Sequence, residues 1–347
     1  MSHRLRRVAP VPVWPSFTGS AQYVGTSAVG QVSVYVDPSL GAPAMQNATD
    51  LLADAGRVVN ANVAIFGTPS QPVNVIVFAL DGRTDGTGGA DHNACDFTNG
   101  GNIEVCASFG NSARVSALFE AELSECAMGG NLCGVSTGEA LSRWCAAVVG
   151  NNALADFASA PAWAQAGMPD YVTRTDNTDQ NEISTGCGMA FLSWLQKLGY
   201  PLKRIAPAMV SLGIRGVLAQ LYSELTGDAA SRAWPGFLAA VKALPGVRSD
   251  DPFGALGTPP RRAARTHVGS EKKVSSRRKR VPSRRRKWRG ATGGQLSLQP
   301  PNLCAALSLR GPPAVSLAFS RSARQSFRAR AEARRSVSDT VDPGRRF

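Results

Sequence analysis

Three glutamates, Glu122, Glu125 and Glu139, stand at spacings that could support chemistry. Glu122 and Glu125 are three residues apart, so on a helix both carboxylates project from nearly the same face. Glu139 stands near the start of the next expected helix, from which its carboxylate could meet the other two. Converging carboxylates can act as a general base, bind a hard cation, or share a proton while the pKa of one of them is raised.

The five residues from Ala121 to Glu125 have the layout of the zinc-binding H-E-x-x-H helix, but neither histidine is present. In that motif two imidazoles one turn apart bind the metal, and the glutamate beside the first is the general base. Here Ala121 and Glu125 stand at the histidine positions and Glu122 at the base position. Alanine coordinates nothing, and zinc prefers nitrogen and sulfur donors in such a setting. The sequence therefore predicts no bound metal or other cofactor and argues against zinc catalysis.

Strand-like segments come first in the chain and helix-like segments follow. Alternating or continuous apolar runs predict strands, and apolar residues at helical spacing predict helices. The expected strands span residues 31–36, 73–80 and 102–108; the expected helices span residues 43–60, 112–128, 136–149, 184–198, 201–212, 213–226 and 229–243. This order predicts an α+β fold, with a small N-terminal sheet followed by a helical half. Residues 1–30 are expected to be irregular, residues 31–250 to form the domain, and residues 251–347 to be a disordered tail.

Three segments in this order resemble plant basic secretory proteins and related bacterial zincin-like proteins that lack the metal-binding histidines. They are Ala121–Glu125, Gly138–Arg143 and Ser184–Leu195, within roughly residues 30–245. The resemblance implies a zincin-like domain, with Glu122 in the place of the base and Glu139 in the place of the third metal ligand. It also implies that the helix carrying Ser184–Leu195 packs behind the site.

These observations predict a non-catalytic, degenerate metallopeptidase domain that binds a peptide or glycan partner in the former active-site cleft. The alternative is a hydrolase that uses Glu122 as a general base with a carboxylate-bound metal. A plainer interpretation gives the glutamates no chemical role. In that case they cap helices or pair with Arg114 or Arg143, as acidic residues on helices usually do.

Six cysteines lie in the expected domain, and none forms a C-x-x-C pair. They are Cys95, Cys106, Cys126, Cys133, Cys145 and Cys187. An even number in one domain favours disulfides and therefore a secreted or cell-envelope protein. Cys95 and Cys106 flank a turn rich in glycine and asparagine, which predicts a disulfide across a hairpin. The alternative is a cytosolic protein with buried free thiols, because cysteine is among the most buried residue types.

The N-terminal residues do not have the pattern of a signal peptide. Three prolines interrupt the apolar run Val8–Pro15, so the continuous apolar core of a signal is missing. No run in the chain approaches the roughly 20 apolar residues of a membrane span. We therefore expect no membrane span, and export is predicted from the cysteines alone.

The net positive charge of the chain belongs to its C-terminal part. Residues 255–347 carry 23 Lys and Arg against 4 Asp and Glu, whereas residues 1–254 are net acidic. The arginine-rich residues 261–289 would bind nucleic acid nonspecifically and in a salt-dependent way, which is a second alternative function. An unselected extension of a GC-rich reading frame would have the same composition.

One histidine, His92, lies in the expected domain, at the end of the loop Asp81–Asn93. Aspartates interleaved with glycines are typical of calcium loops, but the spacing here does not match, which favours a solvated turn. A lone histidine cannot rebuild a zinc site. As a general base it would need a nucleophile beside it, and the sequence supplies none.

Overall fold

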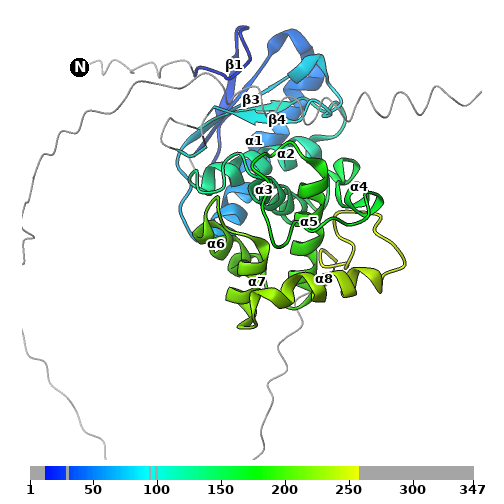
Figure 1. Ribbon diagram of the computed structural model, residues 1–347. Helices are drawn as coiled ribbons and strands as arrows, with labels where there is room; N and C mark the ends of the chain where they lie inside the picture. The colour runs from blue at the N-terminus through cyan, green and yellow to red at the C-terminus, as the bar shows by residue number, and fades with distance from the viewer. Residues whose placement is uncertain (1–11, 29–30, 94, 98–100, 258–347) are drawn as a thin grey trace, which may run out of the picture. The chain divides into compact units, whose positions relative to one another are not determined.

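A computed structural model of the chain describes residues 12–28, 31–93, 95–97 and 101–257. In this part of the chain a five-stranded sheet precedes most of the helices, so the predicted α+β fold is confirmed. Figure 1 shows the sheet and the helical half, with helices α2 and α3 where the two meet. The arginine-rich residues 261–289 lie outside the described residues, so the expectations for them stay predictions. The predicted disordered tail begins at residue 251, but Asp251 accepts hydrogen bonds from the backbone N–H groups of Ala255 (2.8 Å) and Leu256 (2.9 Å), so the prediction is wrong for residues 251–257.

The sheet has a parallel centre and antiparallel edges, in the order β1-β2-β3-β5-β4. Its strands are β1 (Gln22–Thr26), β2 (Val32–Val36), β3 (Val73–Phe78), β4 (Ala90–His92) and β5 (Asn102–Cys106). β2, β3 and β5 run parallel, while β1 and β4 pair antiparallel at the two edges. The sequence predicts an irregular segment for residues 1–30, and β1 shows that this prediction is wrong for part of it. β1 is largely exposed and so lacks the apolar pattern of a buried strand.

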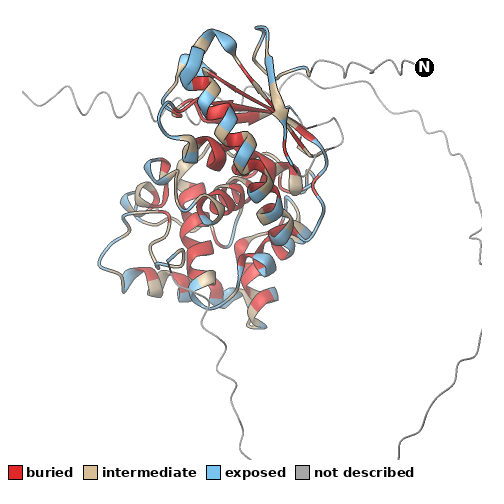
Figure 2. Ribbon diagram, turned by 180° about the vertical axis from the view of Figure 1, so that it is seen from behind, coloured by how far each residue is buried: buried red, intermediate tan, exposed pale blue. Residues whose placement is uncertain are grey.

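One face of the sheet packs against the long helix α1 (Gly41–Phe66). Val32, Val34 and Val36 of β2 are fully buried on this side, because alternate side chains of a strand share a face. α1 continues past its predicted end at residue 60 and stops at Gly67, whose φ of 73° favours glycine. Figure 2 shows buried residues where the helices meet the sheet and each other.

The opposite face of the sheet is covered by the segment before β1. Trp14 packs edge-to-face on Tyr35, with ring centroids 5.3 Å apart. The carboxylate of Glu104, which is fully buried, accepts hydrogen bonds from the backbone N–H groups of Ser16 (2.8 Å) and Phe17 (2.6 Å). This buried carboxylate therefore fixes the N-terminal segment to β5.

The helical half has its own hydrophobic core. Besides α2 (Ser112–Ala127), its helices are α3 (Ser136–Val149), α4 (Ala160–Gln165), α5 (Glu182–Lys197), α6 (Leu202–Leu212), α7 (Leu218–Thr226) and α8 (Ala233–Lys242). The aromatic rings of Trp163, Phe191 and Phe237 meet at its centre, with centroids 5.2 to 5.5 Å from Phe237. No helix among the described residues is long and apolar enough to cross a membrane, in agreement with the sequence.

Candidate functional site

The glutamates singled out in the sequence lie on α2, which is buried on most of its sides. The helix begins after Asn111, whose side chain accepts a hydrogen bond from the Arg114 backbone N–H at 3.2 Å. It packs against α1 and α3 and against the strands β4 and β5. Glu122 therefore lies at the boundary between the sheet and the helical half, and it is only 8% exposed.

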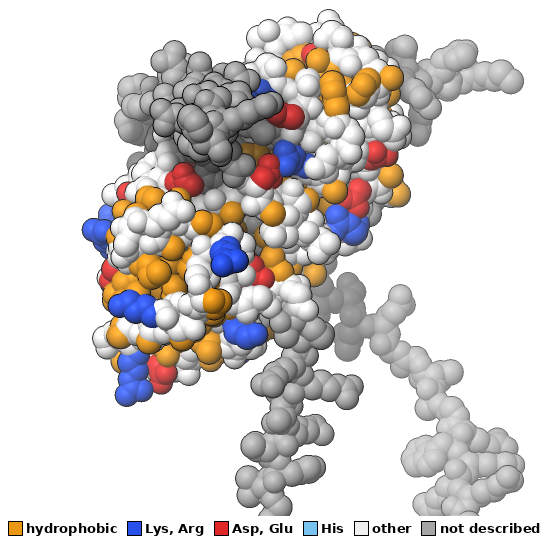
Figure 3. All heavy atoms as spheres, turned by 90° about the vertical axis from the view of Figure 1, so that its right-hand side faces the viewer, with side chains coloured by type: hydrophobic (Ala, Val, Ile, Leu, Met, Phe, Trp, Pro, Cys, Tyr) orange, Lys and Arg blue, Asp and Glu red, His pale blue; other side chains and the backbone are white. Residues whose placement is uncertain are grey.

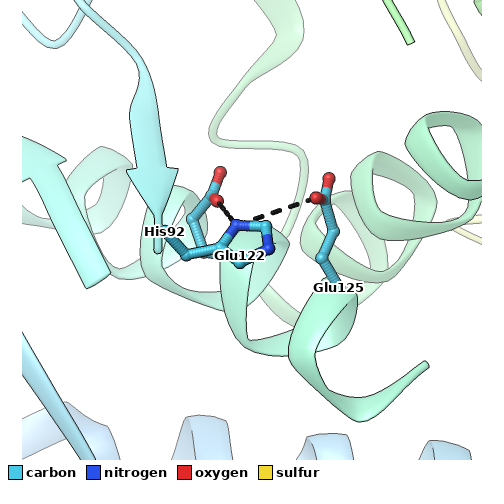
Figure 4. A group of neighbouring side chains, drawn as sticks. All are labelled: His92, Glu122 and Glu125. Atoms are coloured by element: carbon cyan, nitrogen blue, oxygen red, sulfur yellow. Dashed lines mark hydrogen bonds and ion pairs between the residues drawn. The ribbon is translucent and has the colours of Figure 1, made fainter. Parts of the chain in front are cut away.

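His92, at the end of the edge strand β4, points at α2. Its Nδ1 atom lies 2.7 Å from Glu122 Oε2, within hydrogen-bond distance, and 3.8 Å from Glu125 Oε2. Figure 4 shows the imidazole ring between the two carboxylates, with one side chain from the strand and two from the helix. The sequence places His92 alone in a loop, and that prediction is wrong because β4 brings the ring to α2.

Burial and charge act in opposite directions on this group. Burial alone would lower the pKa of His92, but the hydrogen bond to Glu122 and the negative charges of Glu122, Glu125 and Asp91 raise it to about 9. Burial raises the pKa of Glu122, and the paired imidazole only partly offsets this. Burial, and then the neighbouring charge of Glu122, raise the pKa of Glu125 to about 7. At neutral pH His92 is therefore positively charged, while the pKa values of both neighbouring carboxyl groups lie above their ordinary values.

Glu139 lies close to this group but holds a different partner. It stands in the first turn of α3, and its Oε1 is 3.9 Å from Nη1 of Arg143, one turn further along. The close approach of α3 to the preceding loop requires Gly138, because a Cβ there would lie 2.1 Å from the Leu132 carbonyl oxygen. The plain pairing expected from sequence is thus seen between Glu139 and Arg143. Arg114 instead pairs with Asp156, at 2.6 Å.

Two hollows adjoin the group, and both are lined by Glu125 and Glu139. The first, which is open to solvent, also contains Ala121, Glu122, Ser142 and Arg143 beside the apolar side chains Leu118, Leu154 and Phe157. The second is lined by His92, Cys95, Met128, Leu132, Cys133, Gly134, Gly138 and Asp179. The three glutamates of the sequence analysis therefore line the first hollow, and a histidine and an aspartate that the sequence did not connect to them line the second. We call these two adjoining hollows the cleft.

A disulfide borders the second hollow. Cys95, after β4, is bonded to Cys133, in the loop between α2 and α3. The hairpin disulfide predicted between Cys95 and Cys106 is therefore wrong. Cys106 lies on β5 with its side chain buried, and its Sγ contacts the Arg83 carbonyl oxygen at 3.3 Å.

The remaining cysteines of the described residues are free and buried, so four of the six candidate cysteines form no disulfide, as the alternative of buried free thiols predicts for them. They are Cys106, Cys126, Cys145 and Cys187. Burial raises the pKa of the Cys106 thiol to about 11 and that of Cys187 to about 12. These thiols are poor nucleophiles at neutral pH because the thiolate is the reactive form.

The aspartate- and glycine-rich loop before β4 folds as the turn that the sequence favours. Asp85 Oδ1 accepts hydrogen bonds from the backbone N–H of Thr87 at 3.0 Å and from its hydroxyl at 2.5 Å. This is the local Asx pattern of a turn, and it directs the Asp85 carboxylate into the loop itself.

Comparison with protein-family models, curated proteins and solved structures returned no match to this chain. The fold and the site place the chain in a broad class only: an α+β protein with an acidic cleft, in which a strand histidine lies between two helix carboxylates. The zincin-like relationship stays a prediction from sequence.

Proposed function

We propose that this chain is a non-catalytic domain that binds a peptide or glycan partner in the cleft around Glu122, Glu125 and Glu139. The observation that carries the proposal is the hydrogen bond between His92 and Glu122. A general base must be able to accept a proton from a bound water or substrate group. Glu122 has its carboxylate engaged by the imidazole and its side chain is only 10% exposed, so it is poorly placed for that role.

The residues beside Glu122 support binding rather than zinc hydrolysis. Ala121 lines the first hollow at the position where the H-E-x-x-H pattern requires a metal ligand. Glu125 accepts a hydrogen bond from the Ser142 hydroxyl at 3.0 Å. The carboxylates are thus held by neighbouring protein groups, and a zinc-bound hydroxide has no histidine pair to support it.

The cleft has a composition suited to recognition. Binding sites combine apolar walls with a few polar groups that set the orientation of a ligand. Leu118, Leu154 and Phe157 supply the apolar wall of the first hollow, while Glu125 and Glu139 stand at its junction with the second. Each hollow leaves little enclosed room, about 20 Å³ in the first and about 10 Å³ in the second, so a segment of a longer partner that lies across them fits this cleft better than a compact ligand that must enter them.

Export remains part of this proposal. The Cys95–Cys133 disulfide supports an oxidising compartment, because disulfides persist there and are rare in the cytosol.

The alternative function is nonspecific nucleic-acid binding through residues 261–289 of the tail. On the face in Figure 3, acidic and basic side chains are scattered among hydrophobic and uncharged ones, which gives that alternative no support from this face of the described residues.

The test uses the full-length chain on arrays of peptides and of glycans, with cleavage of each bound peptide or glycan followed by mass spectrometry. We expect retention without cleavage, weakened about tenfold or more when Glu125 and Glu139 are both changed to glutamine. Glu224→Gln, which removes an exposed carboxylate from α7, should leave binding unchanged. Cleavage that is abolished by Glu122→Gln would establish the hydrolase instead. Binding that is lost on removal of residues 261–289 but not in the cleft variants would establish the tail as the binding site.

A further inference from the structure

Three side chains from two separate elements converge at the mouth of the cleft. His92 comes from β4, and Glu122 and Glu125 come from α2. One nitrogen or oxygen atom of each lies within 4.8 Å of the others. His92 stands 30 positions before Glu122 in the sequence, whereas Glu122 and Glu125 are three positions apart. The tertiary fold therefore brings the histidine to the two glutamates, and no local motif does so.

Negative charge predominates around this group. Four carboxylates line the two hollows, from Glu122, Glu125, Glu139 and Asp179, against the guanidinium of Arg143 and the imidazole of His92. The charge of Arg143 is shared with groups outside the cluster of carboxylates, because its Nη2 donates to the Phe157 carbonyl oxygen and lies 3.4 Å from Asp250. A further positive charge in the cleft would therefore be stabilised by the surrounding carboxylates.

We propose that His92, Glu122 and Glu125 form a binding site for one divalent transition-metal ion such as Zn²⁺ or Mn²⁺. One imidazole nitrogen and two carboxylate oxygens are a mixed donor set that suits these ions, whereas Ca²⁺ prefers oxygen donors throughout. The site differs from the H-E-x-x-H arrangement in two respects: its histidine comes from the sheet, and Glu122 is a ligand rather than a base. Metal binding displaces the proton shared by His92 and Glu122, and that proton is released to solvent.

The separations of the donor atoms are compatible with a common ion after small side-chain movements. Ligand atoms about 2.0 to 2.2 Å from a metal stand roughly 3 to 3.5 Å from one another. In this structure the histidine nitrogen is 2.7 Å from one carboxylate oxygen and 3.8 Å from the other. The first contact must lengthen and the second shorten, each by less than about 1 Å. The two carboxylate oxygens lie within 4.8 Å of each other and must reach the same spacing, which rotation of the two glutamate side chains supplies.

Three protein ligands leave coordination positions for other groups. Ala121, which lines the first hollow beside Glu122, adds no ligand there. A water molecule or an oxygen of a bound partner can take such a position. The metal site does not depend on the proposed partner binding, because it is complete in the free chain.

The experiment measures metal binding by the full-length chain without any partner. Protein stripped with a chelator is titrated calorimetrically with ZnCl₂ and, separately, with MnCl₂. We expect saturable binding of one ion per chain, weakened at least about tenfold by His92→Ala and by Glu125→Gln, since even changes beside metal ligands commonly cost that much. Pulsed electron paramagnetic resonance of bound Mn²⁺ should show ¹⁴N coupling from one imidazole.

Two controls assign the binding to this group. His3 and His267 are the other histidines of the chain, so the His3→Ala/His267→Ala variant should bind metal and retain the ¹⁴N coupling. Glu224→Gln should also bind normally. No saturable binding of either ion, or binding that survives both His92→Ala and Glu125→Gln, overturns the proposal. If His92→Ala does not fold, Glu125→Gln and the ¹⁴N coupling in the double histidine variant decide the outcome. A failed metal site leaves the binding of a peptide or glycan partner untouched.

Discussion

Helix α2 carries a buried glutamate on each of two sides, and the two glutamates have different partners. On the cleft side, Glu122 meets the imidazole of His92 at 2.7 Å. On the core side, Glu120 is fully buried and meets neutral groups, with its Oε1 3.3 Å from the Asn62 amide and 3.1 Å from the Ser124 hydroxyl. Burial raises the pKa of Glu120 to about 8. Burial raises the pKa of both glutamates, but the imidazole of His92 offsets part of this rise for Glu122, whereas the hydrogen-bond partners of Glu120 are neutral side chains.

This difference shows why a count of acidic residues on a helix says little about chemistry. A buried carboxyl group keeps its charge when a cation is close enough to offset the loss of hydration, and it takes up a proton when its partners are neutral. Glu120 is adjacent to the sequence pattern that suggested a site, yet its surroundings give it a structural role. Glu122 is two residues away, and its carboxylate contacts the imidazole of His92 and lines the first hollow.

The largest expected effect concerns the pH dependence of stability on the core side. The pKa of Glu120 is raised from 4.5 to about 8 on folding, so the folded state binds this proton more tightly than the unfolded state. The contribution of Glu120 to the free energy of unfolding is therefore fully present below about pH 4.5 and is lost as the pH rises through about 8. At about 1.4 kcal/mol per pKa unit, the loss is on the order of a few kcal/mol.

Glu120→Gln should remove that part of the pH dependence, because the amide keeps the hydrogen bonds and cannot ionise. Urea unfolding between pH 5 and 8 measures it, with Glu224→Gln as the matched change at an exposed glutamate. If Glu120→Gln loses as much stability over this range as the wild-type chain, another group titrates and the assignment to the core side fails.

A smaller effect is expected for the coupling free energy between each glutamate and its partner, His92 for Glu122 and Asn62 for Glu120. The double-mutant cycle of His92→Gln with Glu122→Gln, measured in chelator at pH 7, should give a coupling of about 2 kcal/mol, as expected for a charged pair with little exposure. The cycle of Asn62→Ala with Glu120→Gln should give about 1 kcal/mol, the usual size for a neutral hydrogen bond. Equal couplings on the two sides would remove the distinction drawn between them.

The smallest expected effect is a change in the pKa of each glutamate when the serine hydroxyl that donates a hydrogen bond to it is removed. The Ser142 hydroxyl lies 3.0 Å from Glu125 Oε1, and the Ser124 hydroxyl lies 3.1 Å from Glu120 Oε1. Each bond favours the charged carboxylate, so Ser142→Ala should raise the pKa of Glu125 and Ser124→Ala that of Glu120. Each change should cost about 1 kcal/mol of stability. Carboxyl ¹³C resonances followed through a pH titration give both values, and a pKa that falls in either variant contradicts the assigned bond.

Much of the fold could be predicted because its major elements carry strong local patterns. The apolar run of β3 and the apolar spacing of α2 and α3 follow from burial, and the predicted α3 range coincides with the observed helix. The edge strands β1 and β4 could not be found in this way. β1 is mostly exposed and β4 has three residues, so both depend on pairing with a neighbouring strand rather than on their own sequence.

The site could be predicted only in part for the same reason. Glu122 and Glu125 follow from helical spacing, which is local. His92 joins them through the pairing of β4 with β5, in which it stands opposite Ile103, and no pattern near His92 encodes that pairing. The Cys95–Cys133 disulfide is likewise a tertiary contact, since its cysteines are 38 positions apart. The residues before His92, Gly88-Gly89-Ala90-Asp91, form no apolar run, so the sequence carries no local signal for this strand.

That disulfide also makes part of the chain a closed covalent ring. The ring contains β5 and α2 in full, and with them Glu122 and Glu125, while His92 and Glu139 stand just outside its two ends. A proteolytic cut in the exposed turn at Gly110, between β5 and α2, would therefore leave the two fragments joined until the disulfide is reduced. The residues on the two sides of such a cut would therefore stay covalently linked beside the cleft.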